Sequence, residues 1–374
     1  MPKKNVAKRV RNYEKLPIYF YVFCGIFAVA LILYLIAVIS PAFANGYNST
    51  VGAAVRAALA HLTSWIPFSL AEILIYAIPL LIIAVAIYAY RCRCNSWRSV
   101  LVYIGCLISV FSILFSLFVF GFGIGYHTET LDRRLGMETG AVSADDLYHT
   151  AYWLVEEVNT AADGVSFGED GFSLMPYEID EMNDRLLDAF DPICDAYPFV
   201  QRLDSDIKPV LASKLMSYTH ITGVYTYFTG EANLNVAFPD YTLPFTAAHE
   251  LAHQRGIARE NEANFVAFLV TSSCEDPYIR YTAYLNLFEY VANALYRADS
   301  ARYAEILGML DDRVVEELRA YSAFFDTYRD SVAADVSDAV NDTYLKLHGN
   351  TAGTASYGLV VDLAVAYCRL LQAR

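Results

Sequence analysis

PFTAAHELAHQRGIARENEAN, residues 244–264, is the stretch that decides how the C-terminal part of this chain folds. Pro244 suits the first turn of a helix, because that position needs no backbone N–H donor. Gly256 comes where such a helix should stop, since glycine readily takes the left-handed conformation found after helix ends. The stretch therefore predicts one helix over residues 244–255, a tight turn, and a second helix over residues 259–272.

The first of these helices carries the pattern His-Glu-x-x-His. His249 and His253 are four residues apart and share one helix face, so both imidazoles can reach a single metal ion. Glu250 lies beside that face, where it can take a proton from a metal-bound water. This pattern predicts a Zn²⁺ site with Glu250 as the catalytic base and with a third ligand from elsewhere.

Two glutamates at the start of the second helix compete for the third ligand position. Glu260 is favoured over Glu262, because Asn264 lies one turn after Glu260 on the same face and can orient a ligand. The alternative is that both carboxylates are solvated and merely stabilised by the helix dipole.

Further candidates precede the histidine motif. His220 and Tyr225 could donate a hydrogen bond to an oxyanion, although packing alone would also explain them. Glu231 and Asn233 alternate along a predicted strand that could be an edge strand and pair with an extended peptide, their side chains lining the cleft. Solvent-facing polar alternation is the competing interpretation.

The rest of the C-terminal part reads as a mostly helical α+β domain. Two strands, residues 222–228 and 231–238, flank a Thr-Gly turn and predict a small antiparallel β-hairpin. Helical periodicity is expected over residues 144–162, 178–197, 277–296, 300–307, 311–331, 335–347 and 358–371.

The N-terminal part is dominated by three apolar runs, at about residues 17–39, 70–90 and 100–124. Each has about the 20 residues that a helix needs to cross a hydrocarbon core. An amphipathic helix over residues 51–62, between the first two runs, is expected to lie at the membrane interface. We therefore expect a transmembrane anchor over residues 1–124 and a separate domain over residues 125–374.

Charge is divided unevenly between these parts. Ten of the 27 Lys and Arg residues, but only two of the 41 acidic residues, precede residue 125. Basic residues gather before the first apolar run and at residues 91–98, whereas Arg56 stands alone between the first two runs. The positive-inside rule then predicts a cytoplasmic N-terminus and an extracytoplasmic domain. The 39 acids and 17 bases of that domain argue against nucleic acid as a partner.

The domain has three cysteines, Cys194, Cys274 and Cys368, with no close spacing among them. This odd number argues against a disulfide framework and against a cysteine-based zinc site. One bridge among the three stays open, because connectivity cannot be read from a sequence.

A resemblance to a known family rests on several segments together, namely residues 216–218, 222–225, 228–233, 244–246, 249–254, 256 and 260–264. They resemble a bacterial family of membrane-anchored zincins that is catalogued only as a domain of unknown function. The resemblance implies a short multi-span anchor, a gluzincin-like domain, bound zinc and a place in the bacterial cell membrane.

The pattern Glu260-x-x-Ala263-Asn264 is also similar to the third-ligand helix of several gluzincin groups. That similarity implies Glu260 as a zinc ligand and Asn264 as its support, although many such proteins have Asp at the second position. The expected function is hydrolysis of a peptide or protein substrate by a zinc metallopeptidase at the lipid bilayer. The alternative is a non-proteolytic membrane sensor or envelope scaffold with a structural zinc, which normally needs four protein ligands.

Overall fold

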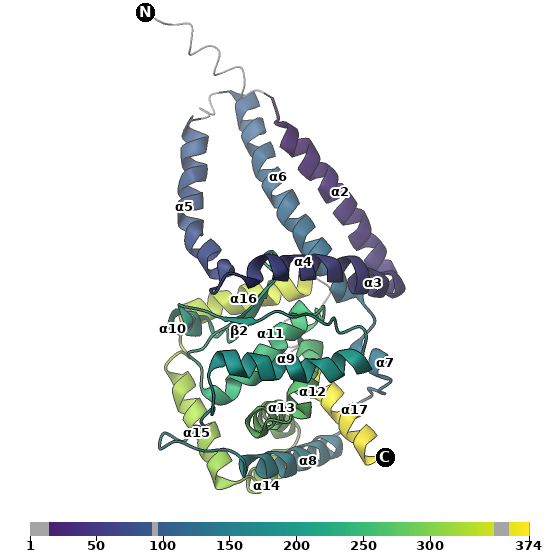
Figure 1. Ribbon diagram of the computed structural model, residues 1–374, viewed down its shortest axis with the longest axis vertical. Coiled ribbons are helices and arrows are strands. Elements are labelled where there is room, and N and C mark those ends of the chain that lie inside the picture. The colour runs from purple at the N-terminus through teal and green to yellow at the C-terminus, as the bar shows by residue number, and fades with distance from the viewer. Residues whose placement is uncertain (1–14, 92–95, 348–358, 374) are drawn as a thin grey trace, which may run out of the picture.

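The computed structural model describes residues 15–91, 96–347 and 359–373. Three long helices extend from one side of a mostly helical body that contains a small sheet (Figure 1). The basic residues before residue 15, and those at 92–95, lie outside the described residues, although the predicted sidedness depends on them.

The three long helices are α2 (Ile18–Ile39), α5 (Leu70–Arg91) and α6 (Trp97–Gly121). All three are long and apolar enough to cross a membrane, and few of their residues are buried within the protein. The prediction of three helices that are long and apolar enough to cross a membrane is therefore confirmed. Helix α2 packs along α6, whereas α5 diverges from this pair toward the body (Figure 1) and contacts α6 through the rings of Tyr88 and Tyr103.

The segment between α2 and α5 lies across the ends of the spanning helices (Figure 1). It contains α3 (Pro41–Tyr47), a π-helical turn (Asn48–Gly52) and α4 (Ala53–Ser64). Helix α4 corresponds to the predicted amphipathic helix, and α3 was not predicted. Arg56 on α4 is only 1% exposed, so it points into the protein and not into solvent.

The sheet has three strands in the order β1-β3-β2: β1 (Ile207–Pro209), β2 (Gly223–Thr226) and β3 (Glu231–Leu234). The predicted antiparallel pairing of β2 with β3 is present, with Val224 opposite Asn233. The prediction of a hairpin alone is wrong, because β1 pairs in parallel with the other side of β3. Three residues are too few to show strand alternation, so β1 carried no signal of its own. Consequently β3 is the central strand and cannot take up a peptide along an edge.

The remaining helices surround one apolar core. The predicted helices are present with ends shifted by a few residues, except that α15 stops at Asp326; two short helices, α7 and α10, were not predicted. The bounds are α7 (Leu131–Leu135), α8 (Ala144–Ala162), α9 (Ile179–Ala196), α10 (Ser213–Met216), α11 (Leu243–Gln254), α12 (Glu260–Ser273), α13 (Pro277–Ala298), α14 (Ser300–Leu307), α15 (Asp312–Asp326), α16 (Val332–Leu347) and α17 (Val360–Gln372).

The core centres on α11, α12 and α13, which pack on one another and on α8 and α9. Nearly every side chain of α11 is buried, which explains the small and apolar residues between its histidines. Cys194, Cys274 and Cys368 all carry free thiols, so none of the three forms the bridge that the sequence left open.

Candidate metal centre

His249, His253 and Glu260 meet at one point between α11 and α12. A carboxylate oxygen of Glu260 lies 3.2 Å from Nε2 of His249 and 3.3 Å from Nε2 of His253. Two ligand atoms bound tetrahedrally to zinc at about 2.0–2.1 Å lie ~3.3 Å apart, so these distances match a zinc site. Two imidazoles and one carboxylate are also the donor set of a catalytic zinc site that keeps one position open. The three side chains therefore fit the predicted metal.

A turn at Gly256 brings the third side chain back to the histidines. Gly256 has φ +96°, a conformation that favours glycine, and it follows directly on the end of α11. Its N–H donates to the carbonyl of His253, and the N–H of Ile257 donates to the carbonyl of Ala252. Nδ1–H of His253 donates to the carbonyl oxygen of Ile257 at 2.7 Å, which leaves Nε2 facing the cluster.

The electrostatics of the cluster favour a bound cation. Burial opposes protonation of His253, but the Glu260 carboxylate outweighs burial and raises the pKa of the imidazole to about 9. Burial alone would raise the pKa of Glu260, whereas the two imidazoles hold it well below its usual range. Without metal the site thus retains a proton between imidazole and carboxylate, which a divalent cation would displace.

Glu250 lies beside the cluster and against strand β2. It is 5% exposed, and a Cβ placed on Gly223 would come within 2.7 Å of its Cγ and Oε1. The close approach of the carboxylate therefore requires glycine at position 223. Burial raises the pKa of Glu250, while the nearby histidines and the backbone N–H of Tyr225 lower it less. A carboxyl with a raised pKa suits proton transfer near neutral pH.

The side chain of the competing glutamate, Glu262, does not belong to the cluster and contacts Arg259 and Leu131. Its carboxylate accepts a hydrogen bond from Arg259 at 2.7 Å and another from the backbone N–H of Leu131 at 3.0 Å. Glu260, and not Glu262, is the residue that the fold brings to the histidines. Asn264 is buried one turn further along α12, where its amide approaches the hydroxyl of Tyr290. No hydrogen bond joins Asn264 to either histidine within the described residues, so its orienting role stays a prediction.

The two candidate oxyanion donors have other contacts. Tyr225 packs its ring on Phe122, and its hydroxyl is buried without a hydrogen-bond partner among the described residues. Burial raises the pKa of Tyr225 to about 12, against a smaller opposing effect of Arg56. His220 packs on Phe325 and forms a 2.8 Å hydrogen bond with a carbonyl oxygen just beyond α15. Among the described residues, neither side chain forms a hydrogen bond with His249, His253 or Glu260.

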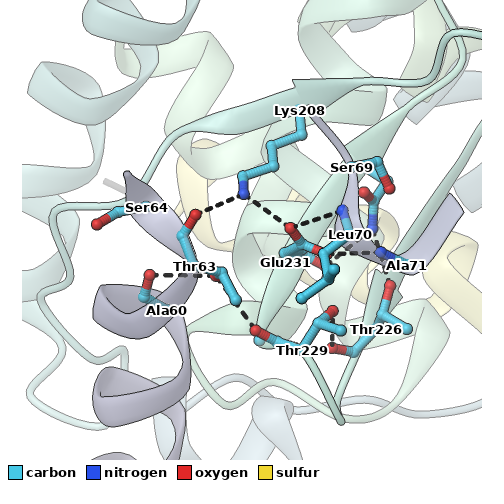
Figure 2. Close-up of polar contacts among 12 residues, drawn as sticks. Ala60, Thr63, Ser64, Ser69, Leu70, Ala71, Lys208, Thr226, Thr229 and Glu231 are labelled. Atoms are coloured by element: carbon cyan, nitrogen blue, oxygen red, sulfur yellow. Dashed lines mark hydrogen bonds and ion pairs between the residues drawn. The ribbon is translucent and has the colours of Figure 1, made fainter. Parts of the chain in front are cut away.

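The prediction that Glu231 belongs to an exposed edge strand is wrong, because β3 is central and this carboxylate is buried. Figure 2 shows its partners: the backbone N–H groups of Leu70 and Ala71, at 3.0 and 2.9 Å, and Nζ of Lys208 at 2.7 Å. Lys208 also donates to the carbonyl of Thr63. Glu231 therefore joins the start of α5 to the sheet through hydrogen bonds.

Asn233 is also buried and also serves the sheet. Its amide donates to the carbonyl of Val224 and to the hydroxyl of Thr226, both on neighbouring β2. A role for Asn233 in lining a peptide cleft has no support in this position.

The sequence did not point to Phe122, whose ring lies against that of His253 in the cluster. It directly follows α6, and its ring lies edge-on to that of His253, with the centroids 5.7 Å apart. Phe122 lies within an apolar run, where a residue at a metal site looks like any other membrane residue. The cluster of His249, His253 and Glu260 therefore lies beside the end of α6, one of the three candidate membrane helices.

Comparison with known proteins identifies the family. A family model described as "Protein of unknown function (DUF3810)" matches residues 47–365, from the segment before α4 to α17. No curated protein and no solved structure matches the chain. The part of the sequence resemblance that named a family of unknown function is thus supported, and its zincin part stays a prediction. Because the match covers most of its length, the chain belongs to the family described as Protein of unknown function (DUF3810).

Proposed function

We propose that this protein is a membrane-anchored zinc metallopeptidase of the zincin type. The observation that carries the proposal is the convergence of His249, His253 and Glu260 at zinc-like spacings, with the buried Glu250 carboxylate beside them. The proposal includes an N-terminus in the cytoplasm and a domain on the outer face of a bacterial cell membrane, where it acts on a peptide or protein.

Zinc, when bound, would make a coordinated water more acidic and polarise the carbonyl of the scissile peptide bond. Glu250 would take the proton from that water and pass it to the leaving amine, a role that its raised pKa suits. Strand β2 is the outer strand of the sheet beside Glu250. No further strand pairs with its outer side among the described residues, so an extended substrate could pair there.

A structural zinc in a sensor or scaffold is less well supported. Structural sites normally surround the metal with four protein ligands. This cluster has three among the described residues, and a second carboxyl group, that of Glu250, lies beside them without being a ligand. A catalytic role explains that placement, whereas a structural role leaves it unexplained.

The test uses the full chain in detergent micelles or proteoliposomes. We expect one zinc per chain, loss of that zinc in His249→Ala, and cleavage of members of a peptide library detected by mass spectrometry. Glu250→Gln should keep the zinc and lose cleavage. Zinc binding without cleavage of any peptide by the wild-type chain would favour the scaffold, and equal zinc content in His249→Ala would refute the site.

A further inference from the structure

The membrane-proximal segment before α5 reaches the turn that joins the two ligand helices. Arg56 is 1% exposed and has no acidic partner among the described residues. Its guanidinium instead donates to Asn48 twice, to the side-chain oxygen at 2.8 Å and to the carbonyl at 2.9 Å. It also donates to the carbonyl of Gly121 at the end of α6 and to the side chain of Gln201. A buried arginine with so many directed hydrogen bonds fixes the relative positions of its partners.

Asn48 connects Arg56 to the turn between the two ligand helices. Its amide donates to the carbonyl oxygen of Gly256 at 2.9 Å, and both groups are buried. Asn48 lies in the π-helical turn between α3 and α4, a type of distortion that is rare and is frequent at functional sites. Arg56 also approaches the Gly256 turn directly, because a Cβ on Gly256 would lie 2.5 Å from Nη2 of Arg56.

Gly256 is three residues after one ligand and four before the next. Its conformation determines where Glu260 returns to the histidines. The adjacent carbonyl of Ile257 accepts the hydrogen bond that orients His253. A shift of the Gly256 turn would therefore move Glu260 and also the Ile257 carbonyl that orients His253.

We propose that Arg56 and Asn48 are positioning residues for the metal centre, supplied by the segment between the first two membrane helices. They hold the Gly256 turn so that His253 and Glu260 face the same point. The inference rests on the metal-binding part of the proposed function and is independent of peptide hydrolysis. It implies that residues 125–374 do not carry the complete metal site.

The experiment uses the full chain in detergent. It compares variants of the Arg56–Asn48–Gly256 hydrogen bonds with a variant of the buried Lys208. Arg56→Met removes the guanidinium, whereas Asn48→Asp keeps an oxygen for Arg56 and replaces the donor to Gly256 by a carboxylate oxygen, which repels that carbonyl. Lys208→Met is the matched control, because Lys208 is a buried cation that also joins the α4 region to the sheet but does not touch the Gly256 turn. The readouts are zinc affinity from competition with a chelating dye, and thermal unfolding of the metal-free chain.

We expect Arg56→Met and Asn48→Asp to weaken zinc binding by roughly 10–100-fold, the usual effect of losing a residue that supports a ligand. Arg56→Lys, which keeps the charge but not the planar fork, should fall between wild type and Arg56→Met. Lys208→Met should lower the unfolding temperature without changing zinc affinity. Equal zinc affinity in wild type and Asn48→Asp, or equal losses in Arg56→Met and Lys208→Met, would overturn the inference.

Amide hydrogen exchange of residues 253–260 in the metal-free chain provides a second readout. It should be faster in Asn48→Asp than in wild type, and unchanged in Lys208→Met. This measurement decides the inference even if the wild-type chain binds no zinc, an outcome that would refute only the proposed function. Unchanged exchange in Asn48→Asp would overturn the inference.

Discussion

Replacement of Gly223 by alanine should slow peptide hydrolysis while zinc stays bound. The atoms nearest to a Cβ at Gly223 belong to Glu250 and Thr246, neither of which is a proposed metal ligand. The added Cβ would lie 2.7 Å from Cγ and Oε1 of Glu250 and 2.9 Å from Cγ2 of Thr246. Because α11 holds the backbone of both residues within the core, the Glu250 side chain is the part that can move.

The size of the effect follows from the overlap. Non-bonded carbon atoms pack at about 3.5–4.0 Å, so the Glu250 carboxylate would have to move by about 1 Å. A misplacement of that size at a reacting group costs about 100-fold in rate, or ~2.7 kcal/mol of transition-state stabilisation. The zinc ligands keep their positions, so the metal content should not change.

The assay is turnover of the peptides that wild type cleaves, together with zinc content and the unfolding temperature. Gly140→Ala is the matched control, because a Cβ at Gly140 has no atom within 4 Å. It should behave as wild type. Wild-type turnover in Gly223→Ala would refute the placement of Glu250 as the base, and loss of zinc along with turnover would show that the substitution acts on the ligands instead.

Three further predictions concern other carboxylates. Glu260→Gln should weaken zinc binding by more than the roughly 10–100-fold typical of supporting residues, whereas Glu262→Gln should leave it unchanged; equal affinities in a chelator competition would contradict the choice of third ligand. Glu231→Gln leaves Lys208 buried without its anionic partner and should lower the free energy of unfolding by about 3–5 kcal/mol, with zinc content unchanged. A denaturation series in detergent measures the free energy of unfolding. A variant that loses zinc but keeps its free energy of unfolding would contradict the role of Glu231 in joining α5 to the sheet. Burial raises the pKa of Glu289 to about 7, so the folded chain retains a proton that the unfolded chain releases above its ordinary pKa of 4.5. The unfolding temperature should therefore decrease as the pH rises from 4.5 to 7, and it should decrease less in Glu289→Gln. An identical pH dependence in the two proteins would refute the raised pKa of Glu289.

The position of Glu231 shows where an interpretation of the sequence failed. Alternation of polar side chains along residues 231–235 is typical of a half-exposed strand. The same alternation arises when both faces are buried and the polar groups have partners elsewhere. Here those partners are Lys208 and the first N–H groups of α5, 161 and 160 residues away along the chain. No local pattern carries that information.

The sequence by itself determined the features that neighbouring residues encode. The three long apolar helices follow from uninterrupted apolar runs, and the shared face of His249 and His253 follows from the geometry of one helical turn. The stop at Gly256 follows from the preference of glycine for positive φ. These properties depend on residues within a few positions of one another, so they can be read without knowing the fold.

Only the tertiary structure decided how the anchor meets the metal cluster. The hydrogen bond from Asn48 to Gly256 joins residues 208 positions apart, and Phe122 reaches His253 from the end of a membrane helix. Such contacts exist because distant segments compete for the same buried donors and acceptors, and packing selects the arrangement that satisfies them. The placement of Glu260, and not Glu262, beside the histidines was decided in the same way, since Arg259 and the start of α7 take up the second carboxylate.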